Sequence, residues 1–151
     1  MTKGTREFKG RVIMAGNIAG EAVVSHGGFN TLASFKKDAI LKKKIVKCSD
    51  QNNAEIFGKI LTGKILCLPK TIGSTSGGMV LQTAASMGAA PAAMLFSEAI
   101  DSLAAAGVIL SDVWNGNRII TIDNLGAEFL AYVQQGQRIE IFDDGRVIVH
   151  V

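Results

Sequence analysis

The sequence predicts an α/β fold in which parallel central strands are flanked by antiparallel hairpins. Between residues 64 and 110, short apolar runs alternate with helix-like segments, the order typical of parallel strands joined by right-handed crossovers. Near both ends of the chain, apolar and polar residues alternate with a period of two, which indicates hairpins. Because 48% of the 151 residues are hydrophobic and 19% are charged, the chain has enough apolar side chain for a core. We expect one domain over residues 1–151, with residues 1–7 as a flexible tail.

The first third of the chain predicts a hairpin followed by a segment without a clear signal. Residues 8–15 indicate a strand, residues 16–17 a turn, and residues 20–25 the returning strand. Residues 31–44 fit either a helix or an irregular segment that covers the core. Residues 50–53 are polar and indicate a loop.

The centre of the chain begins with a strand, a glycine-rich loop and a helix. The apolar run at residues 64–68 ends at Pro69, which is typical of a strand that is buried on both faces. Residues 72–78 then supply the loop. The periodic apolar residues at 80–87 predict a helix, and Gly88 provides its end.

A second strand and helix are expected directly after this unit. Residues 92–96 form another short apolar run, and Ser97 is placed to cap a helix over residues 98–106. Gly107 would end that helix. The apolar residues 108–110 then predict a third buried strand.

The last part of the chain predicts a fourth strand, a short helix and a hairpin. Residues 119–122 fit the strand and residues 125–134 the helix. Residues 138–142 and 146–151 both alternate with period two around an Asp-Asp-Gly turn, which is the pattern of a β-hairpin.

Charge and composition exclude several classes of protein. Six of the sixteen basic residues lie between residues 36 and 47, but no aromatic residues are interleaved with them, so we expect a solvated face or a partner contact rather than nucleic-acid binding. No apolar stretch is long enough to span a membrane and no targeting segment is visible, which favours a cytoplasmic protein. Cys48 and Cys67 are too few for a disulfide framework or a metal site of this chain's own.

The chemistry-bearing segment is the loop at residues 73–78. A loop between a buried strand and a helix lies at the carboxyl edge of a parallel sheet, where α/β proteins bind ligands. Its backbone N–H groups and the helix N-terminus favour an anion, and Ser74, Thr75 and Ser76 add hydroxyl donors. The spacing matches neither a P-loop nor a dinucleotide fingerprint. Taken alone, the residues support an anion site and a simple helix cap equally.

Three segments resemble the small subunit, or swivel domain, of the aconitase X family: KILCLP at 64–69, GSTSG at 73–77 and AAPAA at 89–93. The resemblance extends over roughly residues 8–150 and is weak between 29 and 57. It implies a swivelling β/β/α domain that closes over a larger catalytic subunit. That partner is implied to hold an iron–sulfur cluster or metal ion, so this chain would supply no metal ligand.

The resemblance also implies roles for the residues of the loop. In the aconitase superfamily, the first serine of a Gly-Ser-Ser-Arg loop is the catalytic base, and Ser74 stands at that position. Ser76 replaces the arginine, which argues against a tricarboxylate substrate. The geometry of a loop that opens a helix, rather than the resemblance, predicts contacts from Gly73, Thr75, Ser76 and Gly77 to the substrate carboxylate. Asn30 is added because it ends the flexible, polar-tipped loop at residues 27–30. His26 is expected to be a satisfied loop histidine, and Trp114 to have a core or interface role.

The function implied by this resemblance is that of a hydro-lyase small subunit. Its activity would require the larger subunit, and its substrate would be a small hydroxy acid or hydroxyproline. We expect cis-3-hydroxy-L-proline first, because the low content of charged residues argues against a hyperthermophile and so against the archaeal mevalonate 5-phosphate activity. The other alternative is a non-catalytic swivel module that only closes a partner's site.

Overall fold

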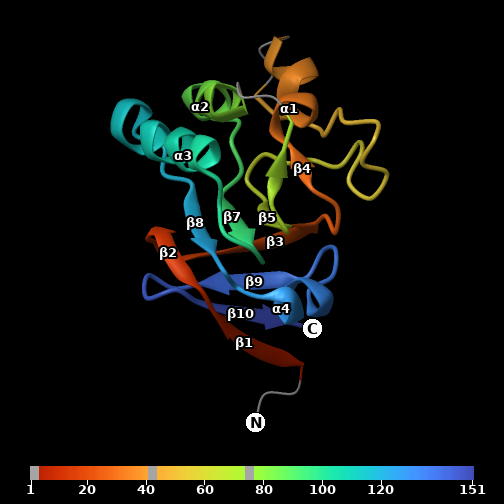
Figure 1. Ribbon diagram of the computed structural model, residues 1–151, viewed down its shortest axis with the longest axis vertical. Helices are drawn as coiled ribbons and strands as arrows, with labels where there is room; N and C mark the ends of the chain where they lie inside the picture. Colours follow the sequence, from red (N-terminus) through yellow and green to blue (C-terminus); the bar gives the residue numbers. More distant parts are fainter. Residues whose placement is uncertain (1–3, 41–43, 74–76) are drawn as a thin grey trace.

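The computed structural model describes residues 4–40, 44–73 and 77–151. Within them, one sheet with the strand order β1-β10-β9-β3-β5-β7-β8-β2 runs through the molecule, and a small sheet pairs β4 with β6 (Figure 1). The strands are β1 Thr5–Lys9, β2 Arg11–Met14, β3 Ile18–Val24, β4 Phe29–Asn30, β5 Ile65–Leu68, β6 Thr71–Ile72, β7 Ala93–Phe96, β8 Ile120–Asp123, β9 Arg138–Ile141 and β10 Arg146–His150. The helices are α1 Thr31–Ile40, α2 Gly77–Ser86, α3 Ser102–Asn115 and α4 Ala127–Tyr132.

The centre of the large sheet is parallel, as the sequence predicts. Strands β3, β5, β7 and β8 lie side by side in the same direction. Every residue of β5, β7 and β8 is buried, which explains why the first two appear in the sequence as uninterrupted apolar runs. The strands expected at residues 64–68, 92–96 and 119–122 are therefore confirmed.

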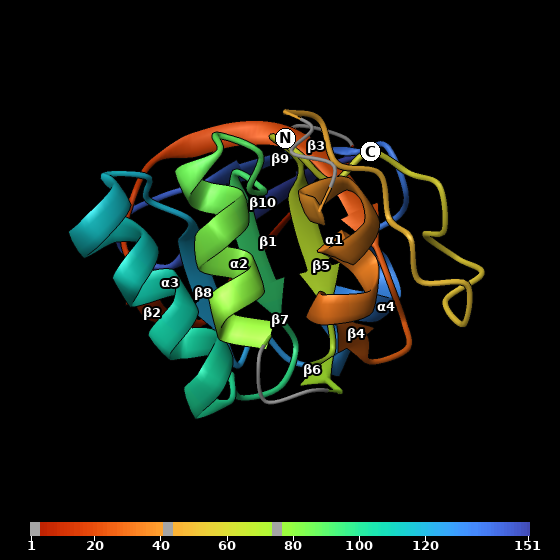
Figure 2. The same ribbon diagram turned by 90° about the horizontal axis from the view of Figure 1, so that it is seen from above.

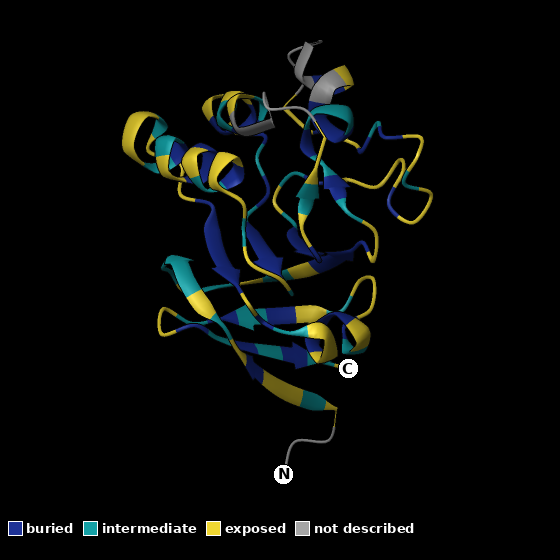
Figure 3. Ribbon diagram, viewed as in Figure 1, coloured by how far each residue is buried: buried dark blue, intermediate teal, exposed yellow. Residues whose placement is uncertain are grey.

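The parallel strands separate two apolar clusters. Along β5, Ile65 and Cys67 face one cluster, which also contains residues of β1, β9, β10 and α4. Leu66 and Leu68 face the other cluster, beneath α1, α2 and α3. Figure 2 shows these three helices side by side over one face of the parallel strands. The architecture is thus a helical layer, a parallel layer and an antiparallel layer. Figure 3 shows the strands of the middle, parallel layer as buried.

The antiparallel layer agrees with the sequence at its C-terminal end and differs at its N-terminal end. Strands β9 and β10 form the expected hairpin. The expected N-terminal hairpin is wrong, because β2 pairs with β8, and β3 pairs with β5 and β9. The strand predicted at residues 8–15 is divided into β1 and β2 at Gly10. Residues 5–7, which the sequence assigned to a tail, pair with β10 as part of β1.

The region predicted as a helix followed by a third buried strand is one long helix, α3. It begins after Asp101 rather than Ser97, because the Asp101 side chain accepts a hydrogen bond from the Ala104 amide. Gly107 lies buried inside the helix, and Gly116 ends it in the left-handed conformation. Residues 108–110 resemble a strand in sequence because α3 is apolar on more than one face.

The other helices follow the sequence more closely. Residues 31–40 form a helix, and the segment after residue 44 is irregular as far as β5. Helix α2 ends just before Gly88, which has a positive φ as expected for a helix terminator. None of the described helices is long and apolar enough to cross a membrane.

Gly10 offers a test of how the chain passes from β1 to β2. A Cβ at this position would collide with the carbonyl oxygen of Asp123 and lie 2.7 Å from Cγ2 of Ile122. We predict that Gly10→Ala lowers the free energy of unfolding by about 1–3 kcal/mol through overpacking. Gly27→Ala is the matched control, because a Cβ there meets nothing within 4 Å. Equal midpoints of urea unfolding for the two variants would contradict this account.

Candidate active site at the carboxyl edge of the sheet

The parallel strands bring several loops to one edge of the sheet. Strands β3, β5, β7 and β8 run in the same direction, so the segments that leave Val24, Leu68, Phe96 and Asp123 emerge on the same side. Helices α1, α2 and α3 also begin on this side, near β4 and β6 (Figure 2). The edge therefore combines polar loops with the electropositive ends of three helices.

A short parallel pairing places Asn30 beside Gly73. Strand β4 pairs with β6, with Asn30 opposite Ile72, and the Phe29 amide donates to the carbonyl of Lys70 at 2.8 Å. Gly73 follows directly with a φ of +98°. A Cβ on Gly73 would lie 2.6 Å from Nδ2 of Asn30. Glycine is therefore required here for two reasons: its positive φ, and the close approach of the Asn30 side chain.

Asn30 also fixes the start of α1. Its Oδ1 accepts a hydrogen bond from the Ala33 amide at 3.0 Å, the arrangement of a helix N-cap. The structure thus brings two of the predicted site residues, Asn30 and Gly73, into contact. With Oδ1 engaged in the cap, the amide Nδ2 is the group of Asn30 suited to donate to a ligand. Its role in substrate binding stays a prediction.

The three predicted hydroxyl residues, Ser74, Thr75 and Ser76, lie outside the described residues. The residues on either side are placed, since Gly73 follows β6 and Gly77 is the first residue of α2. The strand–loop–helix connection expected from the sequence is therefore present at the carboxyl edge. A loop that opens a helix in this way can direct backbone N–H groups towards an anion.

Asp101, which sequence reasoning did not single out, connects β6 to α3. Its Oδ1 accepts a hydrogen bond from the Thr71 hydroxyl, and its Oδ2 accepts from the Ala104 amide at 3.0 Å. The only signal in the sequence is an acidic residue just before an apolar helical pattern, which is typical of an N-cap. Thr71 lies two residues before Gly73, so its hydrogen bond to Asp101 holds the start of α3 next to the segment that leads into the loop.

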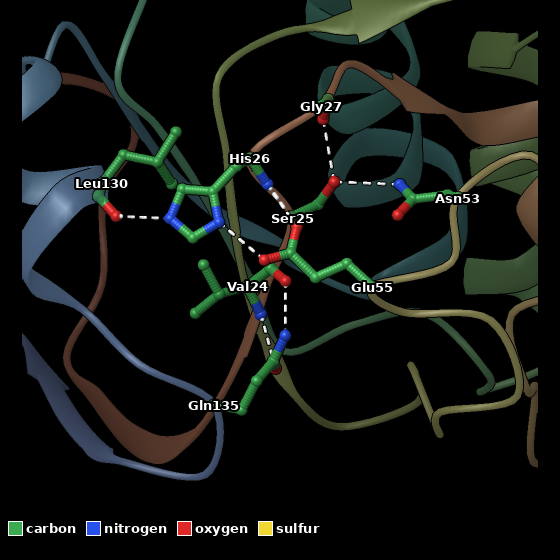
Figure 4. Close-up of polar contacts among 8 residues, drawn as sticks. All are labelled: Val24, Ser25, His26, Gly27, Asn53, Glu55, Leu130 and Gln135. Carbon is green, nitrogen blue, oxygen red and sulfur yellow. Dashed lines mark hydrogen bonds and ion pairs between the residues drawn. The ribbon is translucent and has the colours of Figure 1, made fainter.

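His26 follows β3 at the same edge and is held on both ring nitrogens (Figure 4). Its Nδ1 lies 2.6 Å from Oε2 of Glu55, and its Nε2 lies 3.1 Å from the carbonyl oxygen of Leu130 in α4. A carbonyl only accepts, so Nε2 donates there, and a proton on Nδ1 satisfies the carboxylate. The hydrogen bond to Glu55 raises the pKa of His26 above its ordinary value; desolvation opposes this shift, and attraction to the Glu55 charge and the Leu130 bond add to it.

The backbone around His26 is anchored as well. The His26 amide donates to Oε1 of Glu55 at 2.6 Å, and Ser25 Oγ donates to the Gly27 carbonyl at 2.8 Å. Asn53 Nδ2 donates to Ser25 Oγ at 2.9 Å. These contacts connect the end of β3 to the irregular segment around residue 55, and they agree with the expectation that His26 is a satisfied loop histidine.

The described residues do not fit an iron–sulfur cluster or a catalytic metal. No group of three or more His, Cys, Asp or Glu side chains among them could hold a metal ion. Cys48 and Cys67 are both buried, and desolvation raises the pKa of each thiol, so neither is poised as a thiolate ligand.

A cavity of about 610 Å³ is lined by other described residues than those of the edge. Its described lining residues all fall between positions 37 and 60, and they include Lys37, Lys47 and Phe57. Size alone would favour it as a ligand site. The convergence of helix starts and polar loops at the carboxyl edge is the stronger chemical argument, because those groups can recognise an anion.

Comparison with known proteins identifies relatives of this fold and sequence. The family described as the aconitase X swivel domain matches residues 7–150. The phosphomevalonate dehydratase small subunit of Thermococcus kodakarensis is 32% identical over 107 residues, which cover 71% of this chain and 74% of that protein. The corresponding subunit of Thermococcus onnurineus is 29% identical over 150 residues, covering 95% of this chain and 98% of that protein.

Two solved structures superpose on this chain over nearly its whole length. The crystal structure of Thermococcus kodakaraensis aconitase X in its holo-form superposes with a TM-score of 0.80 at 28% identity, covering 97% of this chain and 99% of that chain. A solution NMR structure of a UPF0107 protein superposes with a TM-score of 0.74 at 27% identity, covering 94% and 97%.

The His26–Glu55 contact predicts a pH-dependent contribution to stability. The folded state raises the pKa of His26, so this stabilisation is complete below the unfolded-state pKa and is lost as pH rises through the folded-state value. We predict that the difference in melting temperature between the wild type and Glu55→Gln is larger at about pH 5.5 than at about pH 8.5.

The matched control for this prediction is Glu128→Gln. Glu128 pairs with Arg6, which stays charged at both pH values, so its effect should not change with pH in this window. A Glu55→Gln effect that is constant, or that grows as pH rises, would contradict the assignment.

Proposed function

Because this chain belongs to the aconitase X swivel-domain family, we propose that it is the small subunit of a dehydratase that removes water from mevalonate 5-phosphate. The observation that carries the proposal is the nearly end-to-end match to a phosphomevalonate dehydratase small subunit. Relatives in Methanosarcina and Aeropyrum have the same name. The strand–loop–helix connection at the carboxyl edge is the feature of this chain that fits the role.

The order of the two candidate substrates is therefore the reverse of the one expected from the sequence. The relatives support mevalonate 5-phosphate and give no support to cis-3-hydroxy-L-proline. The earlier order depended on the low content of charged residues. That quantity bears on thermal stability rather than on which substrate a site recognises, so it was a poor guide.

The reaction requires a base near the carbon next to the substrate carboxylate. Dehydration transfers a proton from that carbon to the base, and the C–H electrons form the double bond. The neighbouring hydroxyl leaves with the C–O electrons and takes up one proton to become water, and the base is restored when it releases the proton it took. We assign the proton abstraction to Ser74, three residues before the first residue of α2. A serine hydroxyl is normally a very weak acid, so the field of the helix N-terminus and the loop amides must lower its pKa.

Substrate binding is assigned to the groups around that serine. The backbone amides of Gly73 and Gly77 and the hydroxyls of Thr75 and Ser76 would donate to the substrate carboxylate. Asn30 Nδ2 would add a further donor from β4, because its contact with Gly73 places it beside the loop. These are donors for an anion, which mevalonate 5-phosphate provides at both of its ends.

A larger subunit is needed to complete this site. The proposal assigns the iron–sulfur cluster or metal ion to that subunit, because the described residues of this chain do not fit one. Lys70 is four residues before Ser74 and is the nearest lysine or arginine in the sequence. Further positive charge around the reacting carboxylate would have to come from the partner.

Substrate identity can be tested with the complex of this chain and the aconitase X large subunit of the same organism. We predict that kcat/KM for mevalonate 5-phosphate exceeds that for cis-3-hydroxy-L-proline by about 10⁴-fold or more, the scale on which a site built to hydrogen-bond a polar group rejects an analogue that lacks it. Proton NMR follows both reactions, through the alkene formed from mevalonate 5-phosphate and through the cyclic imine to which the enamine formed from hydroxyproline tautomerises. A preference for hydroxyproline would contradict the proposal.

The role of Ser74 can be tested in the same complex. We predict that Ser74→Ala lowers kcat by about 10²–10⁴-fold with little change in KM, because it removes the base and leaves the binding groups. Thr75→Val is the matched comparison and should mainly raise KM. Near-normal turnover by a correctly assembled Ser74→Ala complex would instead favour a non-catalytic module that only closes the partner's site.

A further inference from the structure

Helix α3 lacks a polar face. Among its 14 residues, Asp112 is the only charged one, and it pairs with Arg118 at 3.1 Å. One side of the helix is buried against the core through Ala104, Gly107, Val108 and Ser111. A helix that is apolar on all sides is normally buried on all sides, yet α3 stands at the end of the helical layer (Figure 2).

The outer side of α3 exposes large apolar side chains. We call it the α3 surface, and it comprises Leu103, Ile109, Val113 and Trp114, with exposed fractions of 46%, 46%, 68% and 71%. Figure 3 shows much of the outer side of this helix as exposed. Together these side chains expose on the order of 500 Å², which is in the range of the largest apolar patches found on single proteins.

The α3 surface begins at the candidate active site. Leu103 lies in the first turn of α3, next to Asp101, which accepts the hydrogen bond from Thr71 of β6. Two more exposed apolar residues flank the loop itself, Ile72 just before Gly73 and Met79 in the first turn of α2. Ile72 and Met79 form what we call the loop rim. Exposed apolar residues therefore extend from the loop along the outer side of α3.

We propose that the α3 surface and the loop rim are the docking face for the large subunit, an inference that rests on the function proposed above. The uncharged α3 surface calls for an apolar partner surface rather than a charged one. With the loop rim included, the exposed apolar area approaches the roughly 800 Å² that one protein contributes to an interface of standard size. Trp114, a large and mostly exposed aromatic, is suited to be an anchor of such an interface.

A second copy of this chain is a weaker occupant. The α3 surface alone falls short of the roughly 800 Å² per partner of a stable interface. A second copy that also covered the loop rim would block the edge where the substrate must bind. The large subunit can cover both areas, because on the proposed function it completes the site rather than obstructing it.

The test compares two matched valine substitutions in the complex with the large subunit. Val113→Asp places a charge on the α3 surface, and Val151→Asp places one on a valine that is 75% exposed near the C-terminus, on the opposite side of the molecule from α3 (Figure 1). We expect Val113→Asp to raise the Kd for the large subunit at least 100-fold and Val151→Asp to leave it within about threefold. Sedimentation velocity measures both, and far-UV circular dichroism verifies folding.

A second measurement uses the single tryptophan of the chain. Labelling with 5-fluorotryptophan gives one ¹⁹F NMR signal, which reports directly on Trp114. This signal should shift on addition of the wild-type large subunit. Binding of the variant Trp114→Ser to the large subunit is measured as well. Its control is Phe57→Ser, because Phe57 is also an exposed aromatic, 50% exposed, but lies beside the cavity at residues 37–60. Only Trp114→Ser should weaken assembly.

Each other outcome overturns the docking face, its occupant or the proposed function. Equal affinities for Val113→Asp and Val151→Asp would remove α3 from the interface. A dimer of the isolated chain that Val113→Asp dissolves would identify a second copy as the occupant. Failure of the wild type to bind the large subunit would remove both the docking face and the proposed function. A complex that shifts the Trp114 signal but does not dehydrate mevalonate 5-phosphate would keep the docking face and overturn the function alone.

Discussion

Burial of the parallel strands on both faces is the constraint on which the rest of the structure depends. Every residue of β5, β7 and β8 is buried, so polar side chains that could meet a ligand have room only in the loops at the ends of these strands. The parallel direction brings the carboxyl ends to one edge, together with the starts of α1, α2 and α3. Asn30 and Gly73 then meet through the β4–β6 pairing, which the missing side chain of Gly73 permits. The candidate site is a consequence of this packing.

The antiparallel layer supports the same edge from the other side. His26 connects the end of β3 to Glu55 in the irregular segment and to Leu130 in α4, while Gln135 bonds to both backbone groups of Val24. These contacts join parts of the chain that are 29 to more than 100 residues apart. The segment that leads from β3 to Asn30 is therefore fixed at its start.

The sequence predicted what depends on local pattern and missed what depends on distant partners. Continuous apolar runs identified β5 and β7, and alternation around an Asp-Asp-Gly turn identified the β9–β10 hairpin. The run at residues 108–110 was misread because an outward apolar face on α3 imitates a buried strand. The N-terminal hairpin failed because β2 pairs with β8, more than 100 residues away. In the site, the glycine-rich loop was visible from its composition and from the family resemblance. The bond of Asp101 to Thr71 and the contact of Glu55 with His26 join residues about 30 positions apart, and no spacing in the sequence reveals them.

The central claim is that the loop beginning at Gly73 contacts the substrate within a complex of two subunits. The most direct measurement is a crystal or cryo-EM structure of the assembled complex with mevalonate 5-phosphate bound. The account predicts the substrate carboxylate within hydrogen-bonding distance of residues 73–77, with Ser74 Oγ facing the carbon beside that carboxylate. A substrate held entirely by the large subunit, without contact to this loop, would contradict it.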